Sequence, residues 1–402
     1  MTAAAPDTGT RQDAEAKRPA RPDGAPTPIL ILTGFLGSGK STLLRRLLAQ
    51  PEFAGTGLVI NEFGDVAVDH DILAEGRPDV AVTSTGCLCC TAGSDIRVSV
   101  AELHEAARTT GRLPLQRVII ETTGLADPAP VINQLVAGAV PAFGLRDHTV
   151  ARHYRLAGVV TTFDAIHGPQ TLARHAECVK QLAFADRVLL TKTDLLDTED
   201  KAQHLAELRR SIARFNPHAP IDDVADPGFS LVDAFAPRPY APTDLDGDVQ
   251  EWLDDHGHTH HAHHHHDHDH HHDHGEHDHA DHDHEHEHDL NGINSVSVVA
   301  DRPIDKTAFT VFMDTVSMLY GANMLRMKGI IAFADEPDHP YILQAVQHVV
   351  HPLARLDDWP GEDRRSRLVA IVQGLDPTTI EKLFNSVCLR TPADVMGASG
   401  LA

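Results

Sequence analysis

Residues 26–236 alternate between short apolar runs and stretches in which apolar positions recur at helical spacing. Most runs are rich in Val, Ile and Leu on both faces, which is typical of buried parallel strands covered by helices. The pattern predicts an α/β domain with a mostly parallel sheet. The expected strands are Ile29–Thr33, Leu58–Asn61, Val80–Ser84, Val118–Glu121, Leu156–Thr161 and Arg187–Thr191. The expected helices are Lys40–Ala49, Asp95–Arg108, Ala129–Val136, Gln170–Ala183 and Glu199–Phe215.

A shorter pattern of the same kind predicts a smaller α+β domain over residues 291–395. Its expected strands are Ile293–Val299, Met327–Phe333 and Leu368–Gln373, and its expected helices are Lys306–Tyr320 and Pro377–Ser386. Residues 237–290 form a linker that opens with three prolines and continues as a His-rich tract. Residues 1–25 have no apolar segment of signal-peptide type, and their acidic residues disfavour a transit peptide. We expect this segment to be a disordered tail.

Charge and composition narrow the classes of partner. The formal net charge is −24 with His neutral, and an acidic surface repels phosphate backbones, so we expect no nucleic-acid partner. We expect no membrane partner, because no apolar run approaches the ~18 residues that cross a bilayer. Three of the five Cys crowd together, which suits a metal site in a reducing compartment better than a disulfide framework. The expected location is the cytoplasm.

The strand at Ile29–Thr33 runs directly into Gly34-x4-Gly39-Lys40-Ser41, and a helix follows. In this strand–loop–helix context the pattern predicts a phosphate-binding loop, so the first domain is expected to be a P-loop NTPase domain. Its backbone N–H groups and the helix N-terminus favour phosphate. Lys40 is expected to reach the β- and γ-phosphates and Ser41 to ligate Mg²⁺. The expected nucleotide-binding residues here are Gly34, Gly37, Ser38, Gly39, Lys40, Ser41 and Thr42.

Two downstream elements complete the expected nucleotide site. Glu121 ends a buried strand before Gly124, where a Walker B strand places its carboxylate, although an acid there can also simply end a strand. Thr191-Lys192-Thr193-Asp194 follows another buried strand and resembles the Asn-Lys-x-Asp element of GTPases, with Thr191 in place of Asn. The carboxylate of Asp194 can accept two hydrogen bonds from guanine that adenine cannot donate. We therefore expect GTP as the substrate, with Thr191, Lys192 and Asp194 at the base.

The segment Gly86-Cys87-Leu-Cys89-Cys90 gathers three thiols within four residues. Thiolates favour Zn²⁺, Cu⁺ or Co²⁺ over Mg²⁺ or Ca²⁺, and three ligands leave a fourth position open for exchange. A vicinal disulfide at Cys89 and Cys90, or inert buried thiols, are the alternatives. Cys178 and Cys388 lie alone in helical patterns, and we expect them to be small core residues.

The order of these motifs resembles the CobW family of metal-handling P-loop GTPases. The resemblance is carried by Gly34–Thr42, Asn61-Glu-Phe-Gly-Asp65, the Cys motif, Glu121-Thr-Thr-Gly-Leu-Ala-Asp-Pro128, Gln181-Leu-Ala-Phe-Ala-Asp186, Thr191–Asp194 and Trp359–Leu368. It implies a GTPase that binds Zn²⁺ or a similar ion at Cys87, Cys89 and Cys90 and passes it to a client protein. It also implies Glu62 as a further metal-site residue, and Asp65 and Asp69 as candidates to position Mg²⁺ or water. Lys40 and Glu121 complete the expected catalytic set.

A tract of alternating His and acidic residues lies between the two expected domains. Neutral imidazole is a common ligand of Zn, Ni, Co and Cu, so the tract is expected to hold several metal ions with modest affinity for each. The alternative is an acidic linker that only keeps the chain in solution. The candidate ligands are His256, His258, His260, His261, His263, His264, His265, His266, His268, His270, His271, His272, His274, His277, His279, His282, His284, His286 and His288.

Together these features predict a GTP-hydrolysing metallochaperone whose nucleotide state controls its affinity for Zn²⁺, with Co²⁺ and Ni²⁺ as other candidate cargoes. The expected cofactors and partners are GTP or GDP, Mg²⁺, the transition metal and a metal-requiring client protein. A His-rich metal store with a regulatory nucleotide site is one alternative, and a cobalt-handling factor for cobalamin synthesis is another. A kinase or ATPase on the same fold is disfavoured by Asp194.

Overall fold

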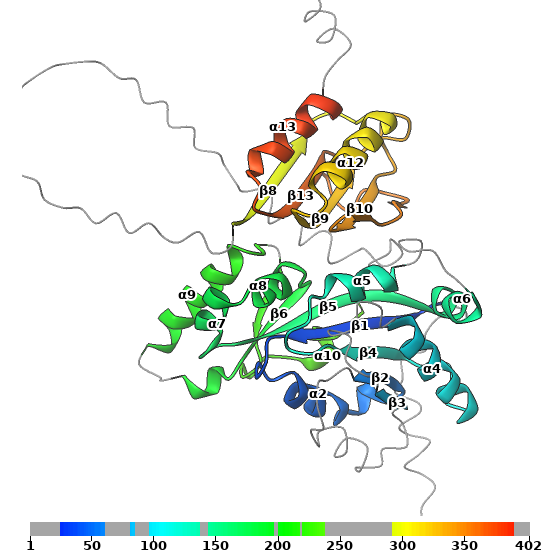
Figure 1. The fold of residues 1–402 in the computed structure, drawn as a ribbon, viewed down its shortest axis with the longest axis vertical. Helices are drawn as coiled ribbons and strands as arrows, with labels where there is room; N and C mark the ends of the chain where they lie inside the picture. Colours follow the sequence, from blue (N-terminus) through cyan, green and yellow to red (C-terminus); the bar gives the residue numbers. More distant parts are fainter. Residues whose placement is uncertain are drawn as a thin grey trace, which may run out of the picture.

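The computed structural model describes residues 25–60, 81–84, 96–136, 144–196, 200–217, 219–237 and 292–389. Figure 1 shows two layered domains, a larger one built on a twisted parallel sheet and a smaller one in which two helices lie against one face of a second sheet. This confirms the expected fold class. None of the helices in the described ranges is both long and apolar enough to cross a membrane.

The sheet of the larger domain has seven strands within the described residues, in the order β3-β2-β4-β1-β5-β6-β7, and every neighbouring pair is parallel. All residues of β1 are buried, and alternate side chains enter two different cores. Ile29 and Ile31 pack in the core on one face, and Leu30 and Leu32 in the core on the other. The strands are β1 (Thr27–Gly34), β2 (Thr56–Ile60), β3 (Ala81–Ser84), β4 (Arg117–Glu121), β5 (Tyr154–Asp164), β6 (Arg187–Thr191) and β7 (Ile221–Asp223).

Helices cover both faces of this sheet, as two-sided burial requires. Residues of α4, α5, α8 and α9 contribute to one core, and those of α2 and α10 to the other. The α-helices are α2 (Lys40–Leu48), α4 (Ile96–Thr109), α5 (Ala129–Leu135), α6 (Gly144–His153), α7 (Gly168–Arg174), α8 (Ala176–Ala183), α9 (Lys201–Ala213) and α10 (Leu231–Ala234). Two short 3₁₀ helices are η1 (Pro51–Phe53) and η2 (Thr193–Leu195).

The helix expected over Gln170–Ala183 is wrong as a single element. The chain forms α7 and α8 with His175 between them in an extended conformation, at φ −129° and ψ 111°. The His175 ring packs on Phe35, with 4.6 Å between the ring centroids. The break therefore accompanies a contact between this segment and the loop after β1, which a helical pattern in the sequence does not encode.

The sheet of the smaller domain is antiparallel, with the order β11-β10-β9-β13-β8 and β12 paired to β10. Leu368, Ala370 and Val372 pack in one core with the two helices, whereas Ile371 belongs to the core of the larger domain. The strands are β8 (Ile293–Ala300), β9 (Met324–Ile331), β10 (Tyr341–Val346), β11 (Val349–Val350), β12 (Ala354–Arg355) and β13 (Ser366–Gln373). The helices are α12 (Lys306–Tyr320) and α13 (Pro377–Cys388).

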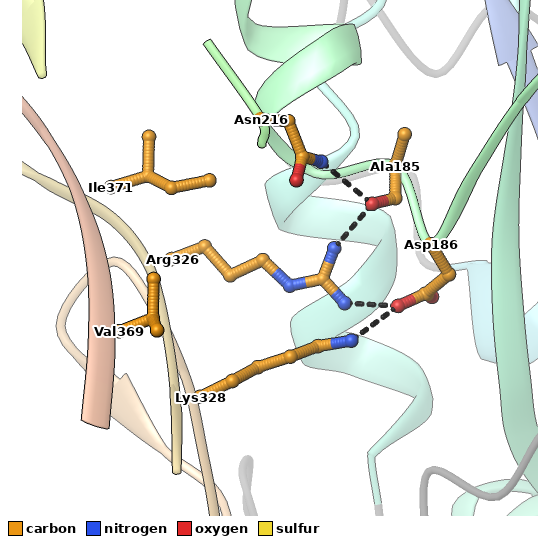
Figure 2. Close-up of a pocket in the computed structure, with 7 residues that line it drawn as sticks. All are labelled: Ala185, Asp186, Asn216, Arg326, Lys328, Val369 and Ile371. Atoms are coloured by element: carbon orange, nitrogen blue, oxygen red, sulfur yellow. Dashed lines mark hydrogen bonds and ion pairs between the residues drawn. The ribbon is translucent and has the colours of Figure 1, made fainter. Parts of the chain in front are cut away.

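The two domains meet where the turn between α8 and β6 contacts β9 (Figure 2). Arg326 donates hydrogen bonds to the carbonyls of Phe184 and Ala185, at 2.6 and 2.9 Å, and forms an ion pair with Asp186. Lys328 also binds Asp186, at 2.7 Å. Burial by itself would raise the pKa of Asp186, but the charges of Arg326 and Lys328 lower it to about 2. This cluster is therefore a buried, charged clamp between the domains.

Candidate nucleotide-binding site

The loop from Gly34 to Gly39 joins the buried end of β1 to the start of α2. Gly34 has a φ of +139°, and a Cβ there would lie 2.3 Å from Thr162 Oγ1. Gly39 has a φ of +91° and is the N-cap of α2. The hydroxyls of Ser38 and Thr162 lie 2.7 Å apart and tie the loop to β5. Glycine is thus needed at both ends of a loop whose N–H groups can surround a phosphate.

Lys40 and Ser41 start α2 at the mouth of this loop. The Lys40 ammonium donates hydrogen bonds to the carbonyls of Gly34 and Phe35, at 2.8 and 3.2 Å. The Ser41 hydroxyl donates to Glu121 Oε1 at 2.8 Å, and Glu121 is only 4 % exposed. The structure therefore brings together the three residues that the sequence assigns to phosphate and Mg²⁺ chemistry.

The donor set at Ser41 and Glu121 fits Mg²⁺. This ion prefers oxygen ligands and retains several waters, so a hydroxyl and a carboxylate at the edge of a phosphate loop suffice for its protein contacts. The two oxygens are 2.8 Å apart and lie at the ends of neighbouring elements, α2 and β4. Ser41 and Glu121 are thus the residues that would hold the ion, directly or through water.

The segment after β4 packs directly beneath the phosphate loop. A Cβ on Gly124 would lie 2.6 Å from the backbone nitrogen of Leu36, so only glycine fits there. Gln181 on α8 donates to the carbonyls of both Gly124 and Ala126, at 3.1 Å each. Gln181 was not expected as a functional residue. Gln181 opens one of the motifs that carry the family resemblance, but that motif does not indicate this contact, which joins segments more than fifty residues apart.

The expected base-recognition element, Thr191–Asp194, begins where β6 ends beside β5. The Thr191 hydroxyl binds the carbonyls of Ser38 and Phe163, at 2.8 and 3.2 Å, so it connects this element to the phosphate loop. Lys192 has a φ of 60°, and its ammonium lies 2.6 Å from Asp164 Oδ2. Asp194 is exposed at the start of η2. The phosphate loop, Glu121 and Thr191–Asp194 thus share the carboxyl edge of the sheet.

Several expected site residues lie outside the described residues. These are Glu62, Asp65, Asp69, the three cysteines of the Cys motif and the histidines of the tract. Within the described ranges, no group of three or more His, Cys, Asp or Glu is arranged to hold a metal ion. Cys178 and Cys388 are buried, at 3 % and 6 % exposure, and burial raises the pKa of each thiol to about 12. The prediction that they are core residues is confirmed.

Both domains match known protein families. Residues 28–222 match the family described as CobW/HypB/UreG, nucleotide-binding domain. Residues 293–388 match the cobalamin synthesis protein cobW C-terminal domain. The two matched segments contain the parallel sheet up to β7 and the whole antiparallel sheet.

Several curated relatives carry names that refer to zinc, and three of them illustrate the range. The zinc chaperone YjiA of Escherichia coli is 26 % identical over 360 residues, covering 89 % of this chain and 98 % of its own. The zinc chaperone CobW of a Sinorhizobium species is 33 % identical over 196 residues, covering 44 % of this chain and 54 % of its own. Zinc-regulated GTPase metalloprotein activator 1 of Schizosaccharomyces pombe is 32 % identical over 198 residues, covering 48 % and 44 %. The alignment thus spans almost all of the first relative and about half of the other two.

A solved structure has the same fold. The Zn(II)-bound YjiA GTPase from Escherichia coli superposes with a TM-score of 0.59 at 22 % identity, over 91 % of this chain and all of the other. At this level of identity the likeness concerns the fold, namely a P-loop domain followed by a smaller antiparallel domain.

Proposed function

The chain belongs to the CobW family, and from that premise we propose that it is a GTP-hydrolysing zinc chaperone. It binds Zn²⁺ at Cys87, Cys89 and Cys90, with Glu62 as a further ligand, and delivers the ion to a client protein. The nucleotide bound at Lys40 and Ser41 changes the affinity for Zn²⁺.

The register of three strands supports coupling between the nucleotide site and the Cys motif. Ile60 on β2 pairs with Ser84 on β3 and with Glu121 on β4, so the three residues are in register on adjacent parallel strands. Glu62 follows Ile60 by two residues and Cys87 follows Ser84 by three. Adjacent strands are about 4.8 Å apart, so the end of β3 lies two strand spacings, about 10 Å, from Glu121, the proposed Mg²⁺ residue. The strand that leads into the Cys motif therefore ends on the same edge of the sheet as the nucleotide site, which supports coupling between them.

The residues assigned to the phosphate site account for the hydrolysis of GTP. Lys40 and the N–H groups of the loop stabilise the negative charge that develops on the β- and γ-phosphates. Bound Mg²⁺ supplies further charge neutralisation. Water attacks the γ-phosphorus, the bond to the bridging oxygen of GDP breaks, and inorganic phosphate leaves. We assign Asp65 and Asp69 as the candidates that position this water, and Asp194 as the residue that selects guanine.

Coupling between the sites requires two states of the segment between the phosphate loop and the Cys motif. Contacts to the γ-phosphate are a common means of ordering such a segment, and hydrolysis releases it. If GTP changes the affinity for Zn²⁺ by some factor, Zn²⁺ changes the affinity for GTP by the same factor. The chaperone would thereby hold the metal in one nucleotide state and release it to its client in the other.

The His-rich tract supports an accompanying role in collecting metal. Nineteen of the 30 His of the chain lie in residues 256–288. Imidazoles at such density bind several ions weakly and can pass them to a tighter thiolate site. Deletion of residues 256–288 is expected to lower the number of Zn²⁺, Co²⁺ or Ni²⁺ ions bound per chain. An unchanged stoichiometry in equilibrium dialysis would mean that the tract only keeps the chain in solution.

The nucleotide and metal assignments can be tested separately. Lys40→Ala is expected to abolish GTP turnover, and replacement of Cys87, Cys89 and Cys90 by Ser is expected to remove the tightest Zn²⁺ site while GTP still binds. The matched control replaces the buried Cys178 and Cys388 by Ala, which leaves the tight site intact. Normal turnover in Lys40→Ala, or one tight Zn²⁺ equivalent in the triple Ser variant, would contradict the proposal.

A further inference from the structure

Asp164 ends β5 beside the base-recognition element and makes two kinds of contact with its two carboxylate oxygens. Oδ1 accepts hydrogen bonds from the backbone N–H groups of Ile166 and His167, at 2.8 and 3.0 Å. Oδ2 accepts from the Lys192 ammonium at 2.6 Å and lies 3.3 Å from His167 Nδ1. The side chain is only 10 % exposed. One carboxylate therefore joins the turn after β5 to the lysine after β6.

Lys192 is constrained at both of its ends. Its backbone is left-handed, with φ 60° and ψ 20°, a conformation that residues other than glycine seldom adopt. Its ammonium is fixed on Asp164, and the side chain keeps one third of its surface exposed. A lysine stem that is anchored at the Cα and at Nζ has few remaining conformations, so its methylene groups form a preformed apolar strip two residues before Asp194 in the chain.

We propose that Asp164 is a positioning residue of the guanine site, which holds Lys192 so that the stem of this lysine forms one wall for the base. The assignment rests on the proposed GTP-binding function. Its ligand is the base end of a guanine nucleotide, which GDP and GTP share. Asp164 acts through Lys192 at the base, so it affects the binding of GDP and GTP to the same extent.

A purely structural role for Asp164 would be the cap of the turn at Ile166 and His167. Asp164→Asn separates the two roles, because the Asn carbonyl still accepts from both N–H groups while the charge that holds Lys192 is lost. Lys192→Met removes the same ion pair from the other side and leaves the turn untouched. The matched control is Asp222→Asn. It removes another ion pair between a carboxylate and a cation, that of Asp222 on β7 with Arg187 at the start of β6.

The experiment measures the affinity for GDP·Mg²⁺ by titration calorimetry in the full chain and in the single and double variants. A charge-assisted hydrogen bond suggests that Asp164→Asn raises the Kd for GDP about tenfold. When Asp164→Asn is added to Lys192→Met, the Kd for GDP of the double variant is expected to differ from that of Lys192→Met alone by less than about twofold. The two residues act as one unit, so the second substitution has little left to remove. In turnover assays KM for GTP rises while kcat stays the same. Asp222→Asn leaves all of these values unchanged.

Two results would overturn the assignment. An unchanged Kd in Asp164→Asn would show that the ion pair does not serve the base. An equal loss of affinity with and without Lys192 would show that Asp164 acts through the turn alone. Failure of the unsubstituted chain to bind GDP would instead refute the proposed function, and the assignment would fall with it.

Discussion

Every residue of β1 in the parallel sheet is buried, whereas β8 in the antiparallel sheet alternates between buried and exposed positions from Val296 to Ala300. Helices cover both faces of the parallel sheet, so only the ends of its strands are open, and Glu121, Asp164 and Thr191 all lie at such ends. The antiparallel sheet has its helices on one face. Its charged residues Arg326 and Lys328 lie in the middle of β9 on the other face and contact the larger domain.

The difference shows how each sheet is used. A sheet that is covered on both faces confines its chemistry to one edge, where loops can differ without disturbing the core. A sheet with a free face can use that face for contact with another domain. We therefore expect substitutions at strand ends of the larger domain to change nucleotide binding, and substitutions in the middle of β9 to change the free energy of unfolding.

The largest change in the free energy of unfolding is expected at the clamp between the domains, formed by Asp186, Arg326 and Lys328. The side chains of Arg326 and Asp186 are 6 % and 9 % exposed, and removal of one partner from a buried ion pair costs about 3–5 kcal/mol. Asp186→Ala is therefore expected to lower the free energy of unfolding by about that amount in urea denaturation. The control is Asp338→Ala, whose partner Arg364 is 66 % exposed, with an expected loss below about 1 kcal/mol. Equal, small losses in the two variants would show that the clamp does not hold the domains together.

A second prediction concerns His351 in the smaller domain. Burial, together with the charge of Arg326, lowers the pKa of His351 from 6.5 to about 4. Between these values the unfolded chain binds a proton that the folded chain does not, so the free energy of unfolding falls as the pH drops from about 6.5 to about 4. Over this pH range the free energy of unfolding falls by about 3 kcal/mol. His351→Gln should abolish this part of the pH dependence, and an identical slope in both proteins would contradict the assignment.

A third prediction concerns Gly124 in the segment after β4. In Gly124→Ala the new Cβ would overlap Leu36 and displace the phosphate loop. A displacement of this kind is expected to weaken nucleotide binding about a hundredfold. The matched control is Gly158→Ala within β5, where the new Cβ would be 3.6 Å from its nearest neighbour. Fluorescence titration with a labelled GDP measures both, and equal affinities in the two variants would argue against close packing beneath the loop.

The smallest change in the free energy of unfolding is expected at acidic pH, from the titration of Asp186. The pKa of Asp186 is lowered to about 2, so its contribution to stability is fully present above its unfolded pKa of about 4 and is lost as the pH falls towards 2. The loss is about 2 kcal/mol. Wild-type protein should therefore destabilise in this range more steeply than Asp186→Asn. Parallel curves would mean that the pKa of this carboxyl group is the same in the folded and the unfolded chain, and would contradict the prediction.

Much of the fold could be predicted because its signals are local. Runs of Val, Ile and Leu indicated β1 to β6 within a few residues at each end, although Asn61 and Val80 lie outside the described residues. The bounds of α12 were predicted correctly. Asp305 caps this helix by accepting a hydrogen bond from the Ala308 N–H at 2.9 Å.

Other elements had no such signal. β9 runs over Met324–Ile331 instead of the expected Met327–Phe333, because its start is fixed by pairing with β13 and β10 and not by its own pattern. The three-residue β7 has a single apolar residue, Ile221, and was missed. The strands β10, β11 and β12 were missed as well, since they are short or amphipathic.

The residues of the candidate site also differ in whether the sequence alone could identify them. The glycines, Lys40 and Ser41 follow a fixed spacing, so the phosphate loop could be located from the sequence. Asp164 at the site was not singled out from the sequence, and neither was the role of Asp186 in the clamp, because their partners Lys192 and Arg326 are 28 and 140 residues away in the chain. Such pairs depend on which strands become neighbours, and a single sequence does not contain that information.

The central claim is that nucleotide state controls metal affinity, and zinc competition titration tests it most directly. The affinity of the tightest Zn²⁺ site is measured in the full chain saturated with a non-hydrolysable GTP analogue and Mg²⁺, and again with GDP and Mg²⁺. We expect the two Zn²⁺ affinities to differ by at least about fivefold, with no difference in Lys40→Ala. Equal affinities in the two nucleotide states would contradict it and would favour a metal store with an uncoupled nucleotide site.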